Sequence, residues 1–282
     1  MIGAIIGDLI GSHYEFNNLK DQNFSPLWHP ESKFTDDTVC TCAIAKAILE
    51  NQDTPDYAKH LRDLCNRYPE AGYGGKFKEW LEDPFMGPYG SWGNGSAMRV
   101  SPIAWAYGGV KVDLGVPQLE IVLNQTLLQC NVTHNHEEAL KGALAISLGI
   151  WWARRGMSKE GIRHVIQTDF YPLAKTLDQI RPSYTFKVSC KASVPVAIIA
   201  FLESESFEDC IRKAISVGGD SDTIAAMAGS IAHAYYDHPS RISEKKGISL
   251  GMVHKMEELI PLEFSQIISE FVSKFNVSYP KP

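Results

Sequence analysis

Apolar residues recur at helical spacing along most of the chain. In eight segments they stand at i, i+3 and i+4, which is the pattern of a helix that buries one face. These segments are residues 39–51, 55–67, 116–130, 137–155, 194–204, 207–217, 223–236 and 262–275. No segment alternates convincingly with period two over six residues, although residues 184–189 are compatible with a short extended piece, so a β-sheet is not required. The pattern predicts an all-α protein.

Residues that start and end helices agree with this pattern. Thr54, Ser158 and Ser206 each place a capping hydroxyl before a periodic run. Gly156 is expected to end one helix, and the glycines at 218–219 another. We expect these residues to mark helix boundaries.

The longest irregular region is the glycine-rich stretch 72–95. Loops of this length are uncommon inside a compact domain unless they serve a site. No linker, composition break or charge run divides the chain. We therefore expect one domain over residues 1–282, with this stretch close to its functional site.

Composition and charge exclude several classes of protein. The hydrophobic share of 44% is that of a globular protein with a sizeable core. The net charge of -6 is spread without a basic patch, so no stable nucleic-acid partner is expected. Apolar stretches are interrupted before the ~20 residues of a membrane span. The six cysteines form no C-x-x-C pair, and no signal-type segment opens the chain, which favours the cytoplasm.

Two short segments pair carboxylates with hydroxyls at predicted helix starts. They are residues 35–38 (Thr-Asp-Asp-Thr) and 220–223 (Asp-Ser-Asp-Thr). Either alone is more often a helix cap than a metal site. Both together place like charges side by side, which is unfavourable unless a cation neutralises them. Such oxygen ligands suit Mg²⁺ or Mn²⁺, and a pair of ions about 3.5–4 Å apart needs several carboxylates from different segments.

The N-terminal segment offers further acids beside a row of glycines. Gly3, Gly7 and Gly11 recur every four residues and give one bare helix face for close packing. We interpret Asp8 on this helix as a buried hydrogen-bond acceptor. Glu15, at the helix end, is the better catalytic candidate.

The glycine-rich stretch 72–95 runs into a motif at residues 89–99, Tyr-Gly-Ser-Trp-Gly-Asn-Gly-Ser-Ala-Met-Arg. A loop of this kind brings backbone N–H groups close to a diphosphate where it enters a helix. Many such loops are simply turns, so the motif indicates phosphate binding only together with the acidic segments.

Taken in order, the motifs resemble those of the ADP-ribosylglycohydrolase family. They are G-D-x-x-G-x-x-x-E, T-D-D-T, G-N-G-S-A-M-R, T-H-x-H and G-G-D-S-D-T, and the resemblance runs from Gly3 to about Tyr236. It implies a compact all-α orthogonal bundle with a central cleft holding a binuclear centre of two Mg²⁺ or Mn²⁺ ions. The implied metal ligands are Thr35, Asp36, Asp37, Asp220, Asp222 and Thr223.

The same resemblance implies the substrate contacts. Asn94, Gly95 and Ser96 match the loop that holds the diphosphate and the distal ribose. His134 matches the histidine that faces the ADP-ribose cleft, whereas His136 is interpreted as a helix-start residue. The implied partners are ADP-ribose and ADP-ribosylated protein.

The implied reaction is metal-dependent hydrolysis at C1″ of the distal ribose, through an oxocarbenium-like state. We assign water activation to Glu15 or Asp37, with Glu15 preferred. Arginine is the usual linkage of bacterial members and is favoured here. A glutamate at position 15 is slightly more typical of members that cleave O-linkages. Serine-linked ADP-ribose, O-acetyl-ADP-ribose and ADP-ribosylated nucleobases therefore remain alternative substrates.

Two other functions fit parts of the pattern. Paired Asp clusters with Mg²⁺ also suit a phosphohydrolase of nucleotide diphosphates. A binding module for ADP-ribose without catalysis would keep the fold, although every implied ligand position is filled here. We expect the chain to act as a monomer.

Overall fold

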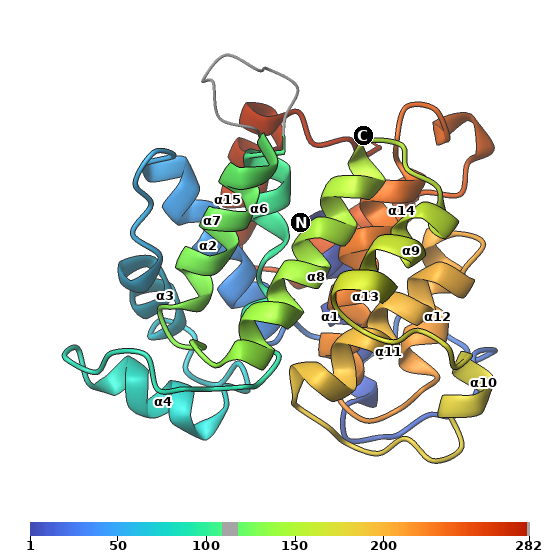
Figure 1. Ribbon diagram of the computed structural model, residues 1–282, viewed down its shortest axis with the longest axis horizontal. Coiled ribbons are helices and arrows are strands. Elements are labelled where there is room, and N and C mark those ends of the chain that lie inside the picture. Colours follow the sequence, from blue (N-terminus) through green and yellow to red (C-terminus); the bar gives the residue numbers. More distant parts are fainter. Residues whose placement is uncertain (109–117, 281–282) are drawn as a thin grey trace.

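The computed structural model describes residues 1–108 and 118–280, and its regular elements are helices (Figure 1). In chain order they are α1 (Ile2–Gly11), η1 (Ser12–Tyr14), α2 (Asp36–Glu50), α3 (Tyr57–Cys65), α4 (Gly75–Glu82), α5 (Gly95–Met98), α6 (Ser101–Ala106), α7 (Gln118–Cys130), α8 (Glu137–Arg154), α9 (Lys159–Asp169), α10 (Leu177–Ile180), α11 (Cys190–Glu203), α12 (Phe207–Ile215), α13 (Ser221–Tyr236), η2 (Ile242–Glu244), α14 (Leu250–Leu259) and α15 (Leu262–Phe275). The prediction of a compact all-α fold is confirmed.

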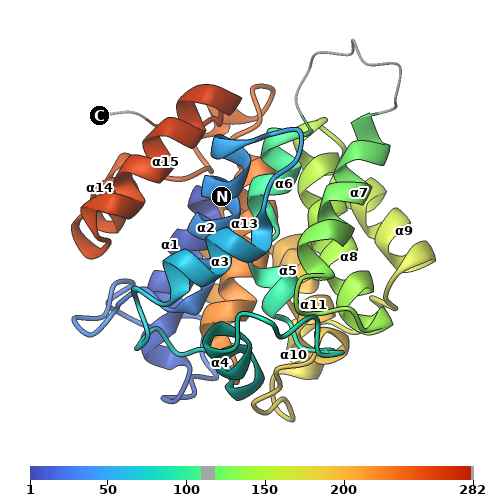
Figure 2. The ribbon, with the colours of Figure 1, turned by 90° about the vertical axis from the view of Figure 1, so that its left-hand side faces the viewer.

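Helices α1 and α13 lie against each other at the centre of the molecule (Figures 1 and 2). Every residue of α1 is buried, and so is every residue of α13 except Tyr235. The two backbones approach closely because α1 presents glycines: a Cβ on Gly7 would lie 2.3 Å from the Ala225 carbonyl oxygen. The predicted bare glycine face is confirmed, and it places the end of α1 beside the start of α13.

The other helices surround this central pair. Helices α8, α11 and α12 pack against α13, while α2 packs against α1 and carries α3 and α15 on its outer side (Figure 2). Helix α14 also contacts α1, so the C-terminal helices join the same core. This packing supports the predicted single domain, which stays a prediction. None of the described helices has the length and apolar character that a membrane span requires.

Helix boundaries match the expected capping residues with one exception. Ser158 and Ser206 accept hydrogen bonds from the backbone N–H three residues on, which confirms both caps. Thr54 does not cap α3; Asp56 does, accepting from the Lys59 N–H at 2.9 Å. The Thr54 hydroxyl instead accepts from Asn51. The Thr54 oxygen is thus taken up in the turn before α3, and the helix begins at Tyr57 behind the Asp56 cap.

Glycines with positive φ end the predicted helices. Gly156 has φ 77°, and Gly218 and Gly219 have φ 72° and 77°. These backbone angles favour glycine because other residues meet a steric penalty there. The last two glycines turn the chain directly into the acidic segment at the start of α13, so their conformation positions that segment.

Three stretches differ from the expected pattern or extend beyond what is described. The first two positions of the predicted helix 116–130 lie outside the described residues. Helix α4 lies within the stretch 72–95, which was expected to be irregular; it is short, and glycines flank it. Residues 184–189 form no strand, and an isolated bridge joins Gly93 to Ser189.

The six cysteines are buried free thiols.

Candidate active site

Asp8 holds the start of α2 against α1. Its buried carboxylate accepts hydrogen bonds from Thr35 N (3.0 Å), Thr35 Oγ1 (2.7 Å) and Thr38 N (3.1 Å), and a fourth from Thr38 Oγ1. The interpretation of Asp8 as a structural acceptor is confirmed. These bonds fix the first turn of α2 and with it the side chains of Asp36 and Asp37.

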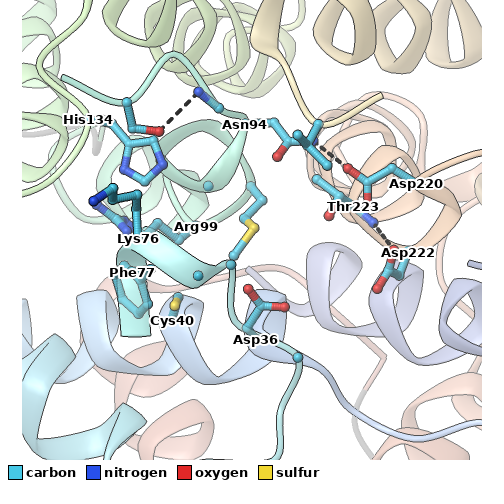
Figure 3. Close-up of a pocket in the computed structure, with 18 of the residues that line it drawn as sticks. Asp36, Cys40, Lys76, Phe77, Asn94, Arg99, His134, Asp220, Asp222 and Thr223 are labelled. Atoms are coloured by element: carbon cyan, nitrogen blue, oxygen red, sulfur yellow. Dashed lines mark hydrogen bonds between the residues drawn. The ribbon is translucent and has the colours of Figure 1, made fainter. Parts of the chain in front are cut away.

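The start of α13 is tied to two other segments. The Thr223 hydroxyl donates to Asp37 Oδ2 at 2.9 Å. The Asn94 amide donates to Asp220 Oδ2 at 2.6 Å and to Ser193 Oγ at 3.2 Å. The two acidic segments and the glycine-rich loop, far apart in the sequence, therefore meet at one place (Figure 3).

The carboxylates converge in two groups of three. One consists of Asp8, Asp37 and Asp222, the other of Glu15, Asp220 and Asp222, and within each group the ligand oxygens lie within 4.8 Å of one another. Asp222 belongs to both groups. We call them the two carboxylate triplets. A shared carboxylate between neighbouring groups is suited to two nearby cations.

The residues present fit a divalent cation. Asp37 Oδ1 is buried and has no hydrogen-bond partner among the described residues. A buried carboxylate oxygen in this state is costly unless an ion or water contacts it. The side chains of the two carboxylate triplets offer only carboxylate oxygens as metal ligands, and Mg²⁺ and Mn²⁺ prefer oxygen ligands.

Burial and mutual repulsion raise the pKa values of these acids. Desolvation, and then the charges of Asp220 and Asp8, raise the pKa of Glu15 to about 7. Desolvation, and then the charges of Asp8 and Asp220, raise the pKa of Asp36 to about 8. The pKa values of Asp37 and Asp222 are also raised well above the usual range, again by burial first. Bound cations would remove this repulsion.

The acids open onto a cleft with a volume of about 460 Å³, within the usual range for small-molecule sites. Eight of the predicted site residues line it: Glu15, Asp36, Asn94, Gly95, His134, Asp220, Asp222 and Thr223. Figure 3 shows Asp220, Asp222 and Thr223 on one side of the cleft and His134, Lys76 and Arg99 on the other, with Asn94 between them.

The other three predicted site residues lie behind the cleft wall. The Thr35 hydroxyl donates to Asp8, and Asp37 Oδ2 accepts from Thr223. The Ser96 side chain is fully buried, and its hydroxyl is 3.5 Å from the Ala139 carbonyl oxygen, to which it donates. None of the three is among the lining residues.

His134 stands against the glycine-rich loop. Its Nδ1 lies 2.7 Å from Thr133 Oγ1, and burial, followed by the nearby Arg99 charge, holds the pKa of His134 well below its usual value. A Cβ on Gly95 would lie only 3.0 Å from His134 Nε2, so glycine permits this close approach. His136 caps α8 by accepting from Glu138 N at 3.1 Å, which confirms its interpretation as a helix-start residue.

Several residues that line the cleft have no role predicted from the sequence. Arg99 is buried and bonded to Gln129 and Thr133; it stood in the quoted motif, which was the available signal. Phe16 and Phe186 also line the cleft, with their ring centroids 6.0 Å apart and nearly parallel. Phe16 directly follows Glu15, but nothing in the sequence joins it to Phe186.

An all-helical frame that gathers buried carboxylates beside a glycine-rich loop, at one cleft, is suited to metal-assisted hydrolysis. Residues 1–259 match the model of the ADP-ribosylglycohydrolase family. The chain belongs to this family and is a hydrolase of glycosidic ADP-ribose bonds. The family is metal-dependent, in agreement with the acidic groups found here.

Curated relatives agree with this assignment, and a solved structure shares the fold. The chain is 27% identical to the ADP-ribosylhydrolase ARH3 of Homo sapiens, over 84% of either chain. It is 26% identical to the ADP-ribosylarginine hydrolase Tri1 of Pseudomonas putida, over 84% of this chain and 69% of that one. A structure titled ADP-ribosylglycohydrolase-related protein complex superposes with a TM-score of 0.66 at 21% identity, covering 99% of this chain and 97% of that chain.

Proposed function

We propose that this protein is a Mg²⁺- or Mn²⁺-dependent hydrolase that removes mono-ADP-ribose from modified arginine side chains, by hydrolysis at C1″ of the distal ribose. The observation that carries the proposal is the pair of carboxylate triplets that share Asp222: one lines a cleft beside the loop of Asn94 and Gly95, and the other lies directly behind its wall. One end of this cleft suits cations and ribose hydroxyls, and the other suits a diphosphate.

The proposed metal ligands come from the two acidic segments, with α1 behind them. They are Thr35, Asp36, Asp37, Asp220, Asp222 and Thr223. Two bound cations would supply positive charge that orients the ribose and balances the clustered carboxylates. The Thr35 hydroxyl donates its proton to Asp8 and accepts from Asp37 N, so one oxygen lone pair is left for a cation.

Glu15 is the better candidate to accept the proton of the attacking water. It lines the cleft, and its carboxylate lies in one triplet with Asp220 and Asp222. Asp37 is held by Thr223 and does not line the cleft, so a ligand role suits it better. An acceptor beside the sugar would assist water as C1″ acquires oxocarbenium character.

The diphosphate is proposed to lie along the glycine-rich loop. Asn94 and Gly95 line the cleft together with His134, and the cations Lys76 and Arg99 lie at the same end. Positive charge near the loop favours an anionic ligand. Ser96 would contribute only its backbone, because its hydroxyl faces Ala139.

Arginine is the favoured leaving group because of the aromatic pair beside Glu15. Phe16 is 78% exposed and Phe186 43% exposed, although both are apolar and both line the cleft. A planar guanidinium stacks well on aromatic faces, whereas a serine or acetyl leaving group offers no planar cation. The Pseudomonas putida relative, an ADP-ribosylarginine hydrolase by name, agrees with this choice.

The proposal is tested by offering the protein ADP-ribosyl-arginine, ADP-ribosyl-serine and O-acetyl-ADP-ribose with Mg²⁺ or Mn²⁺. Intact ADP-ribose should appear, fastest from the arginine substrate. Release of AMP would instead indicate the phosphohydrolase, and binding without turnover would indicate the binding module.

The proton-acceptor assignment is wrong if Glu15→Gln and Asp37→Asn both keep wild-type rates. Phe16→Ala should slow the arginine substrate selectively, and an equal loss on all three substrates would remove the stacking argument.

A further inference from the structure

Two histidines and a glutamate converge outside the cleft, where α1 and η1 meet the segment that leads to α2. His13 Nδ1 lies 3.0 Å from Glu31 Oε2, and His29 Nδ1 lies 3.9 Å from the same oxygen. The two imidazole rings are stacked, with centroids 3.4 Å apart and planes inclined by 13°. One ligand atom from each of the three side chains lies within 4.8 Å of the others.

The distances between these atoms approach those of a metal site, but the ring orientations do not. An imidazole nitrogen binds a metal ion in the plane of its ring, so the two nearly parallel rings would have to turn towards a shared ion. Ligands at about 2.0–2.1 Å from a tetrahedral zinc ion stand roughly 3.3 Å from one another. The Glu31 side chain is 75% exposed, so it is free to move the short distance that is needed. His29 Nδ1 accepts a hydrogen bond from Glu31 N at 3.2 Å, which a bound ion would replace.

The donor atoms select a different metal from that of the cleft. Two imidazole nitrogens and one carboxylate suit Zn²⁺ and similar transition metals, and three protein ligands leave a position for water. The cleft triplets offer only carboxylate oxygens, which suit Mg²⁺ and Mn²⁺. Zn²⁺ at the histidines is therefore distinguished from an ion in the cleft by its imidazole ligands.

The location gives such a site a structural consequence. Residues 15–35 contain no helix or strand and run as a loop from the end of α1 to the start of α2 (Figure 2). Loops of this length without regular structure are uncommon in compact domains. Because His13 belongs to η1 while His29 and Glu31 belong to the loop, an ion bound by all three would fasten the loop to the end of α1.

We propose that His13, His29 and Glu31 form a second metal site, of the zinc type, which braces the segment between α1 and α2. The site uses no cleft residue, so the absence of ADP-ribosyl hydrolysis would leave this proposal standing. Occupancy should slow local opening of residues 16–35, since binding to the native state lowers the population of opened forms.

The test is a Zn²⁺ titration of the full chain in saturating Mg²⁺, in which calorimetry measures the stoichiometry and the affinity of Zn²⁺ binding. The wild type should bind one more Zn²⁺ than His29→Ala, or should bind it at least about tenfold more tightly, since even loss of an outer partner of a metal ligand weakens binding about 10–100-fold. Glu31→Gln should give the same result, and because the side chain is largely exposed, the fold should be kept. X-ray absorption of the zinc-loaded protein should show imidazole ligands.

The matched control is His254→Ala, which removes an exposed histidine far along the chain. This variant should bind Zn²⁺ as the wild type does. Hydrogen exchange over residues 16–35 should slow with Zn²⁺ in the wild type and in His254→Ala, but not in His29→Ala. Equal Zn²⁺ binding by wild type and His29→Ala would overturn the proposal, as would binding that Asp222→Asn alone abolishes.

Discussion

A single methyl group at Gly11 should disturb both folding and catalysis. Gly11 is the last residue of α1, and a Cβ there would lie 2.6 Å from Asp222 Cα and 2.8 Å from Asp222 N. These are backbone atoms in the first turn of α13, so they cannot turn aside as a flexible side chain would. The substitution Gly11→Ala must therefore move one helix away from the other.

The size of the effect follows from this overlap. Ordinary contact begins at 3.4 Å, so the two helices must separate locally by about 0.8 Å. Overpacking of this kind lowers the free energy of unfolding by about 1–3 kcal/mol. Because Asp222 belongs to both carboxylate triplets, the same movement displaces the proposed metal ligands. A misplacement of about 1 Å at a reacting centre can slow a reaction about 100-fold.

Two other glycines provide controls. A Cβ on Gly3 would lie 2.3 Å from the Gly229 carbonyl oxygen, at the far end of the same helix contact, while one on Gly87 would meet nothing within 4 Å. Urea unfolding should show a loss of stability in Gly11→Ala and Gly3→Ala but not in Gly87→Ala. Release of ADP-ribose should fall strongly only in Gly11→Ala. Wild-type stability and rate in Gly11→Ala would refute the argument, as would equal loss of activity in Gly3→Ala.

Three further predictions concern charge, capping and metal. Burial raises the pKa of Asp237 to about 7, so the stability given by its neutral form is complete below the unfolded value of 3.8 and is lost as the pH rises through 7. The melting temperature of Asp237→Asn relative to that of the wild type should therefore increase from about pH 4 to about pH 8. Parallel profiles of melting temperature against pH would contradict this. Ser206→Ala removes the hydroxyl that caps α12 by accepting from Asp209 N at 3.1 Å, and should lower the free energy of unfolding in urea by about 1 kcal/mol; a change near zero would show that the cap is dispensable. Dialysis against EDTA should abolish hydrolysis and lower the melting temperature, both restored by Mg²⁺ or Mn²⁺, whereas full activity in EDTA would exclude a metal requirement.

Local signals in the sequence were sufficient for most helices. The apolar period at 223–236 corresponds to α13, and the hydroxyls of Ser158 and Ser206 cap the helices that they precede. Both signals act over a few residues, so they need no tertiary contact. The start of α3 was misplaced because Thr54 and Asp56 are both capping residues, and the path of the turn decides between them: Thr54 is held by Asn51, while Asp56 accepts from Lys59 N.

The orientation of the site side chains could not be obtained in this way. The sequence placed Thr35 and Asp37 beside Asp36 in one motif, but only Asp36 lines the cleft. Thr35 turns to Asp8 on α1, and Asp37 turns to Thr223 on α13. These partners are distant in the sequence, and their approach depends on how α1, α2 and α13 pack.

The sequence by itself determined the helical class, the spacing of glycines along α1 and the kinds of ligand offered by residues 35–38 and 220–223. Composition and period express these properties residue by residue. Only the tertiary structure decided that Asp222 belongs to both triplets, that Phe16 meets Phe186 and that His13 meets Glu31. Such contacts depend on helix packing and loop paths, which the whole core stabilises and no short segment encodes.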